Sequence, residues 1–264
     1  MNTLGLLFPY FLMNVKNFAV DRGSFITYGL TILCRQIIGV SFIWIVFTKI
    51  PTIAGWSFNE VLFLIGFFET VQGLFFLLFA WTLWFPSKYI VRAELDLVLT
   101  LPIPSYLAVF LREFGRSVME ILSPLFGIVI MIVAVMGMPN KLSLVDIPLI
   151  GIYSLAGAFL IGGIATSMTC ISFWHKGASS WMSAINSILD LGKYPLSIYS
   201  NSIRFFLTYI IPLGFISFFQ GASLLRPRSY LLKGIASVPI ALLVFGVGIF
   251  IWKRGLLKYD SSGH

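Results

Sequence analysis

Two groups of polar residues interrupt the long apolar runs of this sequence, and they are the residues that could do chemistry. Glu69 and Gln72 stand on neighbouring turns of a predicted apolar helix, where a carboxylate is costly and suggests a function by default. Glu69 could relay protons through a membrane, or it could make a polar contact with another helix, such as the one that carries Arg35. The sequence leaves both interpretations open. For Arg35 itself, the pattern favours a headgroup or subunit contact over a substrate site.

The second group lies in residues 88–105, where two basic and two acidic side chains stand between two long apolar runs. The apolar positions follow a helical spacing, and Pro102 and Pro104 stop the helix before the next apolar run. The pattern predicts a short amphipathic helix on the membrane surface, which either rests on lipid headgroups or docks a soluble partner. The charges favour docking. The charged positions are Lys88, Arg92, Glu94 and Asp96, and the apolar positions are Ile90, Val91, Leu95, Val98, Leu99 and Leu101.

The sequence contains no motif for catalysis, metal binding or nucleotide binding. There is no GxxxxGK[ST] phosphate-binding loop, no HExxH and no GxSxG, and the histidines and cysteines lack the spacing of metal ligands. Cys34 and Cys170 both lie inside predicted spans, where a small buried apolar role is the simplest interpretation. We therefore expect no catalytic residue, no metal site and no cofactor in this chain.

The composition identifies the class of protein. Hydrophobic residues make up 58% of the 264 residues and charged residues 11%, whereas about 25% of an ordinary soluble domain is charged. The net charge of +8 comes from single basic residues at the ends of apolar runs, so it reflects membrane topology and not nucleic-acid binding. We expect an all-α membrane protein with a single domain over residues 1–264, because no linker or repeat divides the chain.

The apolar runs predict six transmembrane helices. Residues 4–20 are broken by polar residues and suit a helix in the membrane interface better than a span. The glycines of the fourth span predict close packing against another helix. Basic residues after the last span lie on the inner side by the positive-inside rule, which puts both termini in the cytoplasm. Five of the spans are placed at about residues 25–47, 60–84, 111–136, 147–173 and 232–252.

The position of the fifth span is ambiguous. Hydropathy and the positive-inside count favour residues 203–224 over residues 179–199, because the earlier stretch is only weakly apolar. Pro195, Pro212 and Gly214 argue against this choice, since they break the region into short pieces that suit a re-entrant hairpin buried in protein.

Three stretches, the first of them within residues 88–105, occur in a recognisable order: VRAELDLVLTLPIPS, KYPLSIYSNSIRFFLTYIIPLGFIS and GLLKYDSSGH. Together they resemble the signature segments of a branch of the ABC-2 type permeases, which are the membrane subunits of ATP-binding-cassette exporters. The resemblance extends over most of the chain. Two departures are visible, because Ala93 stands where the family usually has glycine, and Thr100 and Leu101 replace a pair that commonly includes arginine.

The resemblance implies a coupling helix at residues 88–104, seated in a groove of a separate ATPase subunit. The motif positions Arg92, Glu94, Leu95 and Asp96 would be the docking residues. ATP and Mg would be bound by the partner ATPase and not by this chain.

The resemblance also implies an interfacial N-terminal helix and a re-entrant outer hairpin at residues 203–225, so that residues 179–199 become the fifth span. Pro195, Arg204 and Pro212 are the residues of this hairpin region that match the family segment.

Permeases of this family work as pairs, so the resemblance implies a second permease chain, identical or related, in the cell's inner (plasma) membrane. The expected partners are the ATPase subunit, the second permease and membrane lipid. Two other functions stay open. One is a gradient-driven secondary transporter that uses Glu69 as its proton relay, and the other is a membrane scaffold that moves nothing. Loss of ATP would stop an exporter, whereas collapse of the proton gradient would stop the secondary transporter.

Overall fold

The computed structural model describes residues 22–114, 120–138, 142–175 and 189–260, and in these ranges the chain is helical apart from its connections. The predicted interfacial helix over residues 4–20 lies outside them. Paired backbone hydrogen bonds between Ile53 and Trp56 close the loop after the first long helix.

Four of the described helices are long and apolar enough to cross a membrane. They agree with the first, second, fourth and sixth predicted spans, since about 20 apolar residues cross the hydrocarbon core. These helices are α2 (Arg22–Lys49), α3 (Phe58–Phe79), α8 (Asp146–Thr169) with its 3₁₀ extension η3 (Cys170–Phe173), and α12 (Pro227–Leu256).

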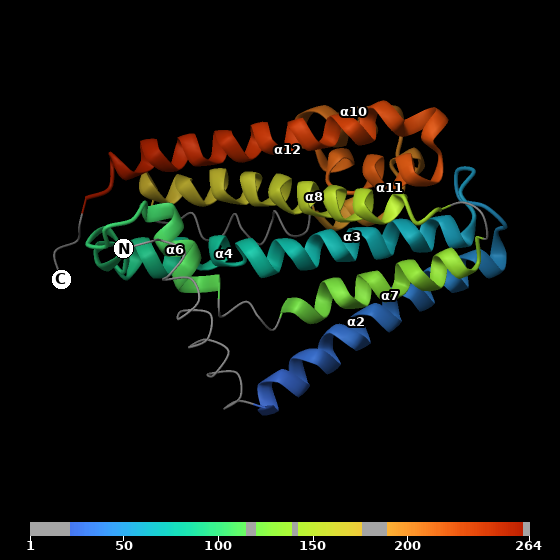
Figure 1. Cartoon of the computed structure of the whole chain (residues 1–264), viewed down its shortest axis with the longest axis horizontal. Helices are drawn as coiled ribbons and strands as arrows, with labels where there is room; N and C mark the ends of the chain where they lie inside the picture. The colour runs from blue at the N-terminus through green and yellow to red at the C-terminus, as the bar shows by residue number, and fades with distance from the viewer. Residues whose placement is uncertain (1–21, 115–119, 139–141, 176–188, 261–264) are drawn as a thin grey trace.

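Helix α3 lies at the centre of the bundle. It packs against α7 (Leu122–Met136) on one side and α8 on another, and α12 covers the far side of α8 (Figure 1). Phe63, Phe67 and Phe68 of α3 have no exposed surface. An apolar sequence on all faces of a helix requires burial all round, which explains the central position of α3.

Glycines set the distance between the packed helices. A β-carbon at Gly127 of α7 would lie 2.5 Å from the backbone nitrogen of Thr70, and one at Gly66 of α3 would lie 2.8 Å from the Gly127 backbone oxygen. A β-carbon at Gly163 of α8 would lie 2.7 Å from the Cα atom of Phe245 in α12. The close packing predicted for the fourth span is therefore found within this chain.

The predicted third span at residues 111–136 falls on two described helices, and residues 115–119 between them lie outside the described ranges. Helix α6 (Ser105–Phe114) lies near α4 (Trp81–Phe85), and α7 begins farther along α3 (Figure 1). The charged residues Arg112 and Glu113 of α6 both form ion pairs with the segment that precedes this helix, so their charges are paired outside any apolar span. Helix α7 has 15 residues, or roughly 22 Å of helix.

A single helix over residues 203–224 is excluded, because the backbone leaves the helical conformation at Ile211 (φ −110°, ψ 101°) and at Pro212 (ψ 48°). The segment instead has two short helical parts with a break between them. The first part is α10 (Asn201–Phe205) with the π turn η6 (Phe206–Ile210), and the second is the 3₁₀ turn η7 (Leu213–Phe215) followed by α11 (Phe218–Leu225).

The expectation of a fifth span at residues 179–199 can be compared with the structure only from residue 189. From there to residue 199 the chain forms the 3₁₀ turns η4 (Asp190–Lys193) and η5 (Leu196–Ile198), not a long helix. Pro195 separates the two turns with an extended ψ of 128°.

Candidate functional site

A surface segment, residues 86–104, connects α4 to α6. It begins with the π turn η1 (Pro86–Val91) and continues into the five-residue helix α5 (Leu95–Leu99). Between them Ala93 has a φ of +57°, a left-handed conformation that is costly for a residue with a β-carbon. The single amphipathic helix predicted at residues 88–104 is therefore wrong, since this left-handed residue breaks it into two turns. The same φ explains why glycine is usual at this position in the family that the sequence resembles.

The inner face of the surface segment packs on a cluster of aromatic rings. Tyr89 stacks on Phe85 with ring centroids 5.3 Å apart, and Phe85 contacts Trp252 of α12 at 4.8 Å. Leu95 and Val98 are buried in the same cluster. The cluster fixes the segment to α4 and to the last turns of α12.

Ion pairs join the surface segment to α6. Lys88 pairs with Glu113, which also accepts a hydrogen bond from Tyr89 Oη at 2.6 Å. Arg112 Nη2 donates to Glu94 Oε2 at 3.0 Å, and Lys88 Nζ lies 4.0 Å from the same oxygen. Burial, followed by the hydrogen bond and charge of Glu113, raises the pKa of Tyr89 above its ordinary value. The network holds the first half of the segment against α6.

The outer face of the segment opens into a shallow groove of about 540 Å³. Its lining carries three cationic side chains, one carboxylate and the side chain of Leu97, which is 61% exposed. Exposed apolar side chains among charges match the composition of a protein interface, where arginine and aromatic residues are enriched. The lining residues are Trp84, Ser87, Lys88, Arg92, Glu94, Leu97 and Arg112.

The four docking residues implied by the resemblance do not share one face. Arg92 is exposed and lines the groove, and Glu94 is half-buried at its edge. Leu95 is fully buried in the aromatic cluster, so it holds the segment in place. Asp96 is half-buried, and burial together with the Asp96 carboxylate raises the pKa of Tyr259 to about 12.

Leu97 was missed in the sequence analysis. A continuous helix would place Leu97 on the same face as Ile90, because seven residues are about two turns. In the structure the break at Ala93 separates them, so that Ile90 is buried and Leu97 is exposed. An apolar residue directly after the charged Asp96 was the signal that could have identified it.

Inside the bundle, Glu69 has three polar partners. Its Oε2 accepts hydrogen bonds from Arg35 Nη2 at 3.0 Å and Gln36 Nε2 at 2.6 Å, and its Oε1 lies 3.6 Å from Lys193 Nζ. The Glu69 side chain is only 4% exposed, and such a carboxylate needs paired charges and hydrogen bonds to offset desolvation. Within the described residues, Gln72 Oε1 is buried without a hydrogen-bond partner. Glu69 thus links α2, α3 and η4.

The predicted hairpin residues lie at the other end of the bundle. Arg204 of α10 donates to the backbone oxygens of Leu196, Ser197 and Tyr199 at 3.1–3.2 Å, which fixes η5 beside α10. Pro195 and Pro212 occupy the breaks before η5 and η7. Arg204 therefore has a structural role in the turn that precedes α10.

An ion pair at this same end of the bundle was not predicted from the sequence. Arg226 Nη2 lies 2.7 Å from Glu60 Oε2, and the Arg226 guanidinium stacks 3.9 Å from the Trp56 ring centroid. Trp56 Nε1 also donates to Ser197 Oγ at 3.0 Å. These contacts join the start of α3 to the start of α12. Only the fold brings them together, because the partners lie far apart in the sequence.

Comparison with known proteins places the chain in a family. A family model described as "ABC-2 family transporter protein" matches residues 33–263. No curated protein and no solved structure matched the chain. The matched range includes all four membrane-crossing helices, in whole or in large part, and the complete surface segment. The chain is therefore an integral membrane protein that belongs to the ABC-2 transporter family, consistent with an ABC-2 type permease.

Proposed function

We propose that the chain is the permease subunit of an ATP-binding-cassette exporter, and that a separate ATPase subunit drives it by docking on the surface segment. The observation that carries this proposal is the groove, where Arg92 and Leu97 are exposed beside a fixed network of charges. ATP and Mg are bound by that ATPase. Family membership supports an ATPase partner, since ABC-2 permeases are membrane subunits and not enzymes.

The way in which the segment is held supports a mechanical role. Its inner face is packed on α4 and α12, and its ion pairs run to α6. Well-packed interiors transmit displacement and do not absorb it. A partner that moves the surface segment therefore moves three helices together. ATP-driven closure of the ATPase would switch the transport path from inner-facing to outer-facing.

A second permease chain, identical or related, completes the path in this proposal. Helix α2 supports a second chain, because only 17% of its most apolar stretch is buried within this chain. Residues 203–225 act as a re-entrant hairpin on the outer side, and the surface segment and both termini lie in the cytoplasm. The plasma membrane is the proposed location and export the proposed direction.

The docking proposal is tested by the double variant Arg92→Glu, Leu97→Asp. Both side chains are exposed, so their replacement leaves the core intact. The tagged chain is purified from its native membrane, and the co-purified ATPase activity is measured. We expect a fall of about tenfold or more, because one contact is lost and a charge is reversed in the interface. The control is Lys49→Glu, an exposed cation at the far end of α2. Undiminished ATPase recovery in the double variant would remove the segment from this role.

The gradient-driven alternative rests on the buried carboxylate of Glu69 in the central helix. It needs no ATPase, so the chain would be recovered alone from the native membrane. In that case Glu69→Gln should abolish transport that depends on the proton gradient. Recovery of an ATPase together with transport that stops on ATP depletion would reject this alternative.

A further inference from the structure

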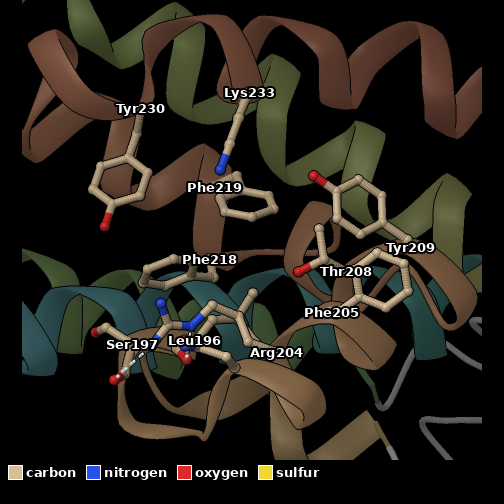
Figure 2. A pocket seen from close by; sticks show the side chains of 11 residues that line it. Leu196, Ser197, Arg204, Phe205, Thr208, Tyr209, Phe218, Phe219, Tyr230 and Lys233 are labelled. Carbon is tan, nitrogen blue, oxygen red and sulfur yellow. Dashed lines mark hydrogen bonds between the residues drawn. The ribbon is translucent and has the colours of Figure 1, made fainter.

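A second hollow of about 250 Å³ lies between the α10–η6 segment and the beginning of α12 (Figure 2). It is distant from the surface segment and takes no part in the ATPase docking proposed above. Its walls are rich in aromatic rings, with Phe218 and Phe219 buried at its base and Phe205 and Tyr209 exposed at its rim. Aromatic walls that begin in the core and end at an exposed rim suit a ligand with an apolar part.

The lining carries positive charge without a compensating carboxylate. Its two ionisable groups other than tyrosine are Arg204 and Lys233, both cationic. The Arg204 guanidinium donates to three backbone oxygens. Lys233 Nζ lies over the Phe219 ring, 4.8 Å from its centroid, and within the described residues no carboxylate pairs with it. Figure 2 shows this nitrogen directed toward Phe219.

The position of Lys233 along α12 indicates which kind of anion could reach its ammonium group. It lies six residues after the start of α12, which is roughly 9 Å along the helix. A lysine near the end of a membrane-crossing helix lies at the depth of lipid headgroups, where it usually extends toward water. Here the ammonium of the exposed Lys233 lies over a ring of the pocket, and the lining of the same pocket includes Thr208 and Asn201.

We propose that this pocket binds an anionic amphiphile, whose phosphate or carboxylate head lies beside Lys233 and whose apolar chain lies against Phe205 and Tyr209. The ammonium supplies a charge-assisted hydrogen bond to the head. The exposed rings at the rim cover the first part of the chain, which then continues into the bilayer. A membrane phospholipid with a net negative charge meets both requirements, whereas a free anion meets only the first.

The test uses the full chain purified in a neutral detergent and measures binding by titration calorimetry. Three probes are compared: dihexanoyl phosphatidylglycerol, dihexanoyl phosphatidylcholine and inorganic phosphate. We expect phosphatidylglycerol to bind more tightly than the other two. Lys233→Gln should weaken phosphatidylglycerol binding about tenfold, since a hydrogen bond to a charged group is lost. Lys233→Arg should restore most of the binding.

The matched control is Arg228→Gln, which removes an exposed cation from the same helix outside the pocket lining. It should leave binding unchanged, and Phe205→Ser should weaken phosphatidylglycerol binding without affecting phosphate. Equal binding of the two lipids, or equal losses in the Lys233 and Arg228 variants, would overturn the proposal. Phosphate binding as tight as that of phosphatidylglycerol would assign the pocket to a free anion and would also contradict it.

Discussion

Ala93 is the residue at which the surface segment changes direction. Its φ of +57° lies where an alanine β-carbon crowds the following carbonyl. The resemblance to ABC-2 type permeases implies that glycine is usual at this position, but the helical spacing of the apolar residues led to the prediction of an unbroken helix. Periodicity reports which positions are apolar and gives no sign of a single residue in the left-handed region.

Replacing Ala93 with glycine should stabilise the protein. The left-handed strain of about 1–2 kcal/mol would be relieved, and glycine's greater unfolded-state entropy would cancel part of this gain. We expect a net gain of up to about 1 kcal/mol, measured as a higher midpoint of thermal unfolding in detergent. Ala236→Gly, in the helical backbone of α12, serves as control and should lose about 1 kcal/mol. A lower midpoint for Ala93→Gly would contradict the conformation assigned to Ala93.

Tyr259 contributes a pH-dependent part of stability at the same surface. Burial and the Asp96 carboxylate raise its pKa from an ordinary value of about 10 to about 12. The folded state therefore holds the phenol proton more tightly than the unfolded state. This contribution is complete below about pH 10 and is lost as the pH rises toward 12.

The measurement is the unfolding midpoint of the protein and of Tyr259→Phe between pH 8 and pH 12. The difference between the two should stay constant up to about pH 10, and the unchanged protein should then lose stability faster than the variant. Asp96→Asn should make this loss smaller and complete it at a lower pH, because removal of the nearby negative charge lowers the folded-state pKa of Tyr259. Parallel curves throughout the range would show that Tyr259 has no shifted titration.

At the scale of elements, the predicted spans that match the structure are those that form long apolar helices. The long apolar helices were predictable from their composition, and α3 was also predictable as a helix with a costly polar centre. The start of the third span was not predictable, because Glu113 is paired with Lys88 in another turn of the chain. A hydropathy pattern assigns such charges to the first turns of the span, whereas in the structure they lie in the short helix α6.

The contact between α3 and α7 depends on the small size of Gly127. An alanine there would place its β-carbon 2.5 Å from the Thr70 backbone nitrogen, so the two helices would have to separate. We expect Gly127→Ala to destabilise the protein by about 1–3 kcal/mol, despite alanine's higher helix propensity. The matched variant is Gly151→Ala on α8, where a β-carbon meets no atom within 4 Å. That variant should gain up to about 1 kcal/mol. Equal effects in a chemical unfolding experiment would contradict the close contact.

The network around Glu69 shows which part of a buried polar site can be predicted. The cost of a carboxylate in an apolar helix pointed to a partner, and Arg35 on α2 was one of the two alternatives. Lys193 could not be predicted, because it reaches Glu69 from a 3₁₀ turn that comes after α7 and α8 in the chain. A sequence reveals that a charge needs pairing, but the fold decides which distant residue pairs with it.

At the scale of the whole molecule, two ends of one bundle carry different features. The surface segment, its groove and the last turns of α12 lie at one end, and the α10–α11 region with the start of α12 lies toward the other (Figure 1). Helices α3, α8 and α12 connect them through buried apolar contacts. Helix α2 diverges from the bundle toward the end with α6, which leaves most of its surface for contacts outside the chain.

Photo-crosslinking in the native membrane can show whether an ATPase touches the surface segment. A photoreactive amino acid is placed at Leu97, and a second one at Leu232, which is 83% exposed near the start of α12. We expect a covalent adduct with a nucleotide-binding ATPase from position 97 and none from position 232. An ATPase adduct from position 232 alone, or from neither position in membranes that contain the assembled transporter, would contradict docking at the surface segment.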